Sequence, residues 1–142
     1  MDGQVYIVFF FFDFMRKTIV IAEDQRVERE WLVRIVSDKR YWAFGAENGQ
    51  VALDYILQTS VQGLITDICM PEMDGCELIK NLARREIKIP IIVLSSMNLS
   101  EIGKKVKASS YEGEVIYFRK DVSQDGDNGF LAKLQSLVPL YR

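Results

Sequence analysis

The stretch that decides the fold covers residues 64–75 and reads LITDICMPEMDG. An apolar run leads directly into Asp67, and Pro71 and Gly75 then break the regular pattern. This order predicts a buried strand that ends in a carboxylate and is followed by a loop. In open α/β sheets the loops after strand ends build the binding site. Asp67 is therefore expected to face a crevice at the edge of a sheet.

A second apolar run, residues 18–22, also ends in carboxylates, Glu23 and Asp24. If the two strands lie parallel, three acids meet at one edge, where unit charges about 4 Å apart repel by ~4 kcal/mol at an effective dielectric near 20. A divalent cation relieves this repulsion. An all-oxygen site with few protein ligands suits Mg²⁺, which is the cofactor we predict here.

Two further strand-like runs supply a hydroxyl and an ammonium. Residues 91–95 end in Ser95, and residues 115–119 are followed by Lys120. A carboxylate surrounded by a metal, a hydroxyl and an ammonium can accept a phosphoryl group as a nucleophile. Asp67 is the predicted phosphoacceptor.

Apolar runs alternate with amphipathic stretches along the chain, which is the pattern of βα units around a parallel sheet. Strands are expected at residues 18–22, 41–46, 63–67, 89–95 and 115–119. Helices are expected at residues 26–37, 49–58, 75–85, 100–107 and 128–137. The fourth helix is expected to be short or mobile because Gly103 lies in its middle. Asp74, directly before Gly75, is expected to cap the third helix.

With these residues in place, the chain resembles the receiver domain of two-component response regulators over residues 16–137. The resemblance implies an α/β fold, a flavodoxin-like doubly wound sheet of five parallel strands in the order 2-1-3-4-5 with helices on both faces. The features that carry it are Glu23 and Asp24, Asp67 with the following MPEMDG, Asn48 and Gly49 opening the second helix, Ser95, Lys120, and Tyr117 three residues before that Lys.

The resemblance also implies the roles of the residues at the site. Asp67 attacks a phosphohistidine on a partner, and Lys120 neutralises one phosphoryl oxygen. Mg²⁺ is bound by Asp24, Asp67 and the backbone carbonyl of Cys69, with Glu23 acting through water. The chain is expected to be a signalling receiver that assists its own phosphotransfer and dephosphorylation, rather than an enzyme in its own right.

The expected switch consists of Ser95, which turns to the phosphoryl group, and Tyr117, which then turns inward. The output is altered affinity of the fourth-helix and fifth-strand face for a downstream protein or domain. Because the chain contains no His, the phosphoryl donor is a separate histidine kinase or histidine phosphotransfer protein. A homodimer is a further expected possibility.

The composition of the chain is consistent with a receiver domain but would not indicate one by itself. A length of 142 residues suits one domain. A net charge of −2 argues against direct nucleic-acid binding. Cys69 and Cys76 lack the paired spacing of a zinc site, so reduced thiols in a cytoplasmic protein are expected.

Residues 1–14 do not fit the receiver pattern, which is expected to occupy residues 15–142. Residues 5–12 read VYIVFFFF, too short to span a bilayer, so no membrane association is expected. This segment is either an extension, native or introduced by cloning, or an added strand that pairs with a sheet edge or a partner.

Three alternatives remain open at this point. The chain could be a phosphorylation-independent interaction module with a receiver-like fold. It could be a phosphatase with an Asp nucleophile, although such enzymes usually carry a second acid where this chain has Cys69. It could also be a receiver cut from a larger regulator such as a chemotaxis methylesterase, to which VLSSM at residues 93–97 is slightly similar.

One position departs from the family pattern. Lys120 is followed by Asp121, where receivers typically have Pro in a cis peptide bond. A cis bond without Pro costs about 3 kcal/mol, so we predict a trans bond and a displaced loop after the fifth strand.

Overall fold

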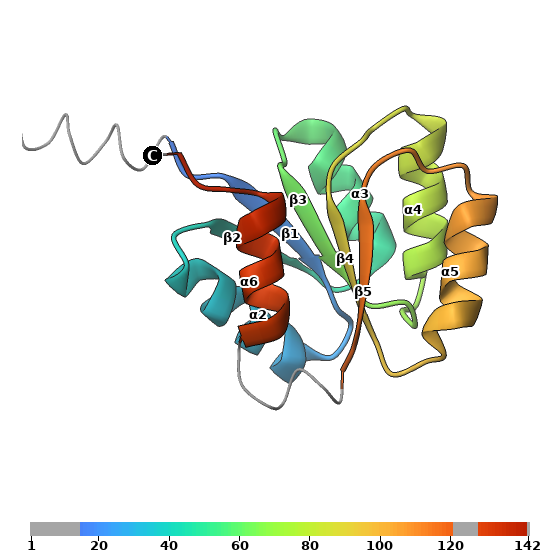
Figure 1. Cartoon of the computed structure of the whole chain (residues 1–142), viewed down its shortest axis with the longest axis horizontal. Helices are drawn as coiled ribbons and strands as arrows, with labels where there is room; N and C mark the ends of the chain where they lie inside the picture. Colours follow the sequence, from blue (N-terminus) through green and yellow to red (C-terminus); the bar gives the residue numbers. More distant parts are fainter. Residues whose placement is uncertain (1–14, 121–127, 142) are drawn as a thin grey trace, which may run out of the picture.

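β-Branched and aliphatic runs form the strands of this protein, and amphipathic segments between them form the helices (Figure 1). The computed structural model describes residues 15–120 and 128–141. Along the chain the elements are β1 (Thr18–Ala22), α2 (Arg26–Asp38), β2 (Trp42–Ala46), α3 (Gly49–Gln58), β3 (Gly63–Thr66), α4 (Gly75–Arg84), β4 (Ile91–Ser95), α5 (Leu99–Ala108), β5 (Val115–Arg119) and α6 (Asn128–Leu137).

Over the described ranges, the sheet has five strands, all parallel, in the order β2-β1-β3-β4-β5. The predicted fold class and strand order are confirmed. The central pair runs from Ile19 opposite Gly63 to Ala22 opposite Thr66, so β1 and β3 end side by side. Parallel pairing therefore brings the residues that follow these two strands to one edge.

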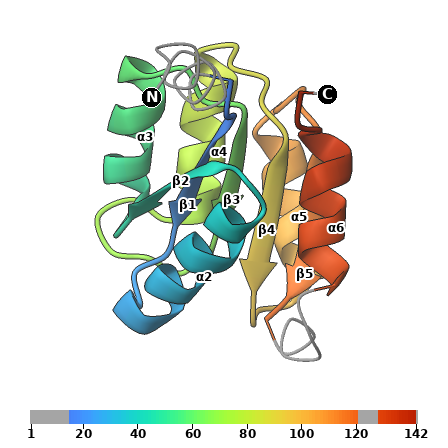
Figure 2. The ribbon, with the colours of Figure 1, turned by 90° about the vertical axis from the view of Figure 1, so that its left-hand side faces the viewer.

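Helices cover both faces of the sheet (Figure 2). Alternate residues of β1 point to opposite faces, so Val20 packs in one core and Ile21 in the other. The first core includes buried side chains of α3, α4 and α5, and the second includes those of α2 and α6. The two cores fix the sheet from both sides and hold its strand ends in place.

Two predicted strands begin later in the structure than in the sequence analysis. β2 begins at Trp42, because Tyr41 instead turns into the second core, where its hydroxyl donates a 2.6 Å hydrogen bond to the Val138 carbonyl. β4 begins at Ile91, because Pro90 has no N–H to donate. The Pro90 carbonyl still accepts a hydrogen bond from Leu64, so the alignment with β3 is kept.

The fourth predicted helix is longer than expected. It corresponds to α5, which has ten residues from Leu99 to Ala108, so the prediction of a short helix is wrong. Buried Ile102 and Val106 anchor it to the first core, and the Asn98 side chain accepts a hydrogen bond from the Ser100 N–H. These contacts outweigh the cost of Gly103, beside which the structure leaves open space.

The remaining differences are single residues at element ends, where α2 extends to Asp38, α4 stops at Arg84 and β3 stops at Thr66 instead of residue 67. Among the residues that the structure describes, no helix combines the length and apolar character needed to cross a membrane.

Candidate functional site

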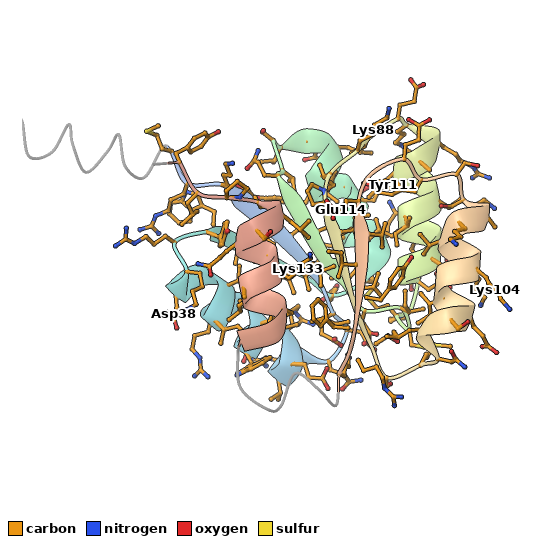
Figure 3. All side chains as sticks on the ribbon, in the orientation of Figure 1. Asp38, Lys88, Lys104, Tyr111, Glu114 and Lys133 are labelled. Atoms are coloured by element: carbon orange, nitrogen blue, oxygen red, sulfur yellow. The ribbon has the colours of Figure 1, made fainter. Side chains whose placement is uncertain are left out.

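Four strand ends meet at one edge of the sheet, where backbone hydrogen bonds continue just past the strands. The Asp67 N–H donates to the Ala22 carbonyl at 2.9 Å, and the Lys120 N–H donates to the Ser95 carbonyl at 3.1 Å. The side chains that follow β1, β3, β4 and β5 are thereby fixed in neighbouring positions. In Figure 3, Lys88, Tyr111 and Glu114 mark the opposite edge of the sheet, before β4 and β5 begin.

Three carboxylates gather at this edge. Glu23, Asp24 and Asp67 each offer an oxygen, and these oxygens all lie within 4.8 Å of one another. Glu23 is 1% exposed and Asp67 is 8% exposed, so both carboxylates are removed from bulk water. The structure thus brings together the acids that the sequence predicted to converge.

Lys120 extends from the end of β5 into this cluster. Its Nζ lies 2.8 Å from Glu23 Oε2 and 2.9 Å from Asp67 Oδ2. It also lies 2.8 Å from Oε2 of Glu28, on the first turn of α2. The sequence analysis missed Glu28, because its position on a helix gives no sign that it reaches a strand end.

Burial and neighbouring charges have opposite effects on the pKa values of Glu23 and Lys120. Burial raises the pKa of Glu23 to about 7, although the hydrogen bond from Lys120 favours its ionised form. Burial alone would lower the pKa of Lys120, but its three carboxylate partners together raise that pKa above its ordinary value. Lys120 is therefore a firmly protonated cation beside Asp67.

The Asp67 side chain and its loop are held from several directions. Oδ1 accepts a 2.7 Å hydrogen bond from the Ile68 N–H, and the Thr66 hydroxyl donates to the Asp67 carbonyl at 2.7 Å. Asp74 caps α4 as predicted and forms a capping box with Glu77. The loop between β3 and α4 thus fixes the orientation of Asp67.

The backbone around the acidic pair is fixed by Arg29. One guanidinium nitrogen of Arg29, Nη1, donates to the carbonyls of Glu23 and Asp24, at 2.8 and 3.2 Å. The sequence analysis did not identify this residue, whose position six residues after Glu23 becomes informative only once the turn into α2 is seen. Arg29 orients the two acids by holding their main chain.

The donor set at the cluster fits Mg²⁺. Asp24 and Cys69 both line an open pocket of about 470 Å³, together with residues that include Asp74 and Met97. The cluster provides the hard oxygen ligands that this ion requires, and the pocket beside Asp24 provides room for water. The Cys69 thiol lies at this pocket beside the Met97 sulfur, 3.1 Å away.

The two predicted switch residues occupy neighbouring strands. Ser95 is buried at the end of β4, where its hydroxyl accepts a 3.1 Å hydrogen bond from the Met97 N–H. Tyr117 is half-buried on β5, opposite Val93, and packs against the first core. The switch roles of both residues stay predictions.

Comparison with known proteins identifies the family. The sequence profile of the response regulator receiver domain matches residues 19–133 of this chain. The chain belongs to the response regulator receiver family. It is thus a signalling receiver domain of two-component systems.

Individual relatives of this receiver agree with the profile. It is 42% identical to the response regulator GtcR of Aneurinibacillus migulanus over 84 residues, 59% of this chain and 34% of GtcR. It is 31% identical to a protein-glutamate methylesterase/protein-glutamine glutaminase of Treponema denticola over 96 residues, 66% of this chain and 25% of that protein. The receiver therefore spans about a third of GtcR and a quarter of the methylesterase.

A solved structure supports the same fold. The chemotaxis protein CheY4 of Vibrio cholerae aligns with 86% of this receiver and 98% of its own chain, with a TM-score of 0.74 and 21% sequence identity. At this level of identity the likeness concerns the fold alone.

Two predictions fall on residues that the structure does not describe. The predicted trans bond joins Lys120 to Asp121, and Asp121 lies outside the described ranges. The proposed extension or added strand of residues 1–14 also lies outside them. Both stay predictions.

Proposed function

We propose that this receiver accepts a phosphoryl group from a phosphohistidine onto Asp67 in a Mg²⁺-dependent reaction. The observation that carries the proposal is the contact of Lys120 Nζ with Asp67 Oδ2 inside the cluster of Glu23, Asp24 and Asp67. Because Lys120 is protonated and lies beside the buried Asp67 carboxylate, its positive charge can neutralise the negative charge that phosphoryl transfer brings to the site.

The chain's own residues account for the main requirements of transfer. An oxygen of Asp67 attacks phosphorus, the bond from phosphorus to the donor imidazole nitrogen breaks, and the imidazole leaves with the electron pair of that bond. Lys120 offsets the negative charge of a phosphoryl oxygen, and the Ile68 N–H holds the carboxylate in place. Mg²⁺, held by Asp24, Asp67 and the Cys69 carbonyl with Glu23 nearby, would supply further charge neutralisation at the transferring oxygens. When water hydrolyses the acyl phosphate, its oxygen attacks phosphorus, the bond from phosphorus to the Asp67 oxygen breaks, and the carboxylate leaves while Lys120 again offsets the charge of a phosphoryl oxygen.

The signal would pass through β4 and β5. Ser95 exchanges its hydrogen bond with the Met97 N–H for one to the phosphoryl group, and the β4–α5 loop moves with it. Tyr117 then turns inward, and the α5 and β5 face shifts toward its second conformation.

Membership of the family implies two kinds of partner, a phosphoryl donor and an output protein or domain. We assign the donor role to a histidine kinase or a histidine phosphotransfer protein, because this chain has no His of its own. A cytoplasmic setting, the absence of nucleic-acid binding and the possibility of a homodimer belong to the same proposal.

The alternatives receive less support. A phosphorylation-independent module has no need for Lys120 to lie 2.9 Å from a buried Asp67. Phosphatases with an Asp nucleophile usually carry a second acid two residues after it, where this chain has Cys69. The similarity to the methylesterase is confined to a quarter of that protein and favours the receiver part alone.

Incubation with acetyl phosphate tests the function. We expect intact mass spectrometry to show one added phosphoryl group in the presence of Mg²⁺ and almost none with a chelator. The added group should be labile at alkaline pH, as an acyl phosphate is. Equal labelling with and without Mg²⁺ would contradict the proposed mechanism.

Magnesium binding should depend more on Asp24 than on Glu23. Asp24 lines the open pocket, whereas Glu23 is buried and already bonded to Lys120. We expect Glu23→Ala to weaken binding by at most about 10-fold to 100-fold, and Asp24→Ala, which loses a direct ligand, to weaken it more, as measured by calorimetric titration. If Glu23→Ala is the more damaging variant, the two ligand roles are reversed.

A further inference from the structure

Glu28 is a third carboxylate partner of Lys120 that neither the acidic cluster nor the family resemblance assigns. It projects from the first turn of α2, and its Oε2 lies 2.8 Å from Lys120 Nζ. This distance equals that from Lys120 to Glu23. The contact joins residues 92 positions apart in the chain, so only the fold brings them together.

The contacts that the structure describes for Lys120 are enough to engage all of its N–H donors. A protonated Lys has three N–H donors, and Nζ lies within hydrogen-bond distance of three carboxylates, those of Glu23, Glu28 and Asp67. For Lys120 to donate to a phosphoryl oxygen, one of these contacts has to open. The function proposed above therefore requires an exchange of partners.

Exposure decides which partner leaves at the lowest cost. The side chain of Glu23 is 1% exposed and that of Asp67 is 9% exposed, so before transfer either carboxylate would remain buried without its cation. The side chain of Glu28 is 50% exposed and regains water when it separates. An exposed ion pair contributes little to stability, whereas a buried charge left unpaired is strongly destabilising.

The position of Glu28 on α2 also tolerates release. An acidic residue in the first turn of a helix interacts favourably with the positive end of the helix dipole. The residue before this helix, Gln25, makes no side-chain cap. The Glu28 carboxylate therefore keeps a favourable environment after Lys120 turns away.

We propose that Glu28 holds the third donor of Lys120 in the unphosphorylated receiver and gives it up to the phosphoryl group. The inference rests on the proposed function at Asp67. Glu28 is a positioning residue that competes with the incoming phosphoryl oxygen for the Lys120 ammonium. Removal of the Glu28 carboxylate is therefore expected to raise the affinity of the site for a phosphoryl group and the rate of phosphorylation.

Glu28→Gln tests the competition, with Glu30→Gln as the matched control. Glu30 lies on the same helix, is exposed and pairs with Arg26 at 2.8 Å, so its loss removes an equal charge close by without touching Lys120. Two measurements apply, the affinity for beryllium trifluoride with Mg²⁺ by calorimetry and the initial rate of phosphorylation by acetyl phosphate.

We expect Glu28→Gln to raise both the affinity for beryllium trifluoride and the phosphorylation rate by about threefold, a factor typical of a partly exposed ion pair. Glu30→Gln should leave both within error of wild type. A merely structural role of Glu28 would lower thermal stability without raising either quantity.

Unchanged or reduced values in Glu28→Gln, or an equal rise in Glu30→Gln, would overturn the inference and leave the proposed function standing. A wild-type protein that neither binds beryllium trifluoride nor becomes phosphorylated would overturn the proposed function and the inference with it. The two failures are thus distinguishable.

Discussion

Asp67→Asn is expected to abolish phosphorylation by acetyl phosphate while the protein remains folded. The amide keeps the shape of the side chain and an oxygen that can accept the 2.7 Å hydrogen bond from Ile68. It removes the nucleophilic charge and one of the three carboxylate partners of Lys120. Loss of a nucleophile usually reduces a rate by several orders of magnitude, so no added mass should appear after the time that labels wild type fully.

Asp54→Asn provides the control for this experiment. Asp54 is exposed on α3, where its side chain accepts a hydrogen bond from the Gln50 side chain. The same change of Asp to Asn outside the cluster should leave the rate of labelling as in wild type. Equal labelling of Asp67→Asn and wild type would show that another residue accepts the phosphoryl group.

Gly75→Ala is expected to be the most destabilising of the glycine-to-alanine substitutions. A Cβ at this position would lie 2.2 Å from the Asp67 carbonyl oxygen and 3.0 Å from the Ile68 Cα, both of them backbone atoms. The backbone cannot yield as a flexible side chain does, so the β3–α4 loop has to move. We expect the free energy of unfolding to fall by about 2–4 kcal/mol, at or above the upper range for overpacking.

Gly103→Ala is the matched comparison, because Gly103 also lies in a helix, but apart from its own stretch of helix no atom of the described residues lies within 4 Å of its added Cβ. This variant should be more stable than wild type by about 0.5–1 kcal/mol, since Ala favours the helix. Denaturant titration measures both changes. Gly75→Ala should also slow phosphorylation, because the displaced loop carries Asp67, and a variant as stable as wild type would contradict this description of the loop.

Much of the fold was predictable from the sequence, because each strand is a short apolar run bounded by turn residues. The parallel arrangement then places Glu23, Asp24, Asp67, Ser95 and Lys120 at one edge. The errors fell where tertiary contacts override local pattern. Tyr41 belongs to a strand-like run of the sequence, but its side chain packs in the second core and its hydroxyl is hydrogen-bonded to the Val138 carbonyl. Helix α5 is longer than the presence of Gly103 suggested.

The residues that support the site were not predictable in the same way. Glu28 and Arg29 lie among several charged residues of α2, and nothing in the spacing distinguishes them from Arg26 or Glu30. Their roles depend on the turn between β1 and α2, which aims Arg29 at two backbone carbonyls and Glu28 at Lys120. Such contacts depend on the angle of a helix, which the sequence pattern does not determine.

The most direct test of the account is to locate the phosphoryl group on the wild-type protein. Phosphorylation in Mg²⁺, reduction of the acyl phosphate with borohydride, and peptide mass spectrometry would mark the modified residue as homoserine. The account predicts one modified residue per chain, at Asp67, and none when Mg²⁺ is chelated. Modification at Asp24, at Glu23 or at any residue outside the cluster would contradict it.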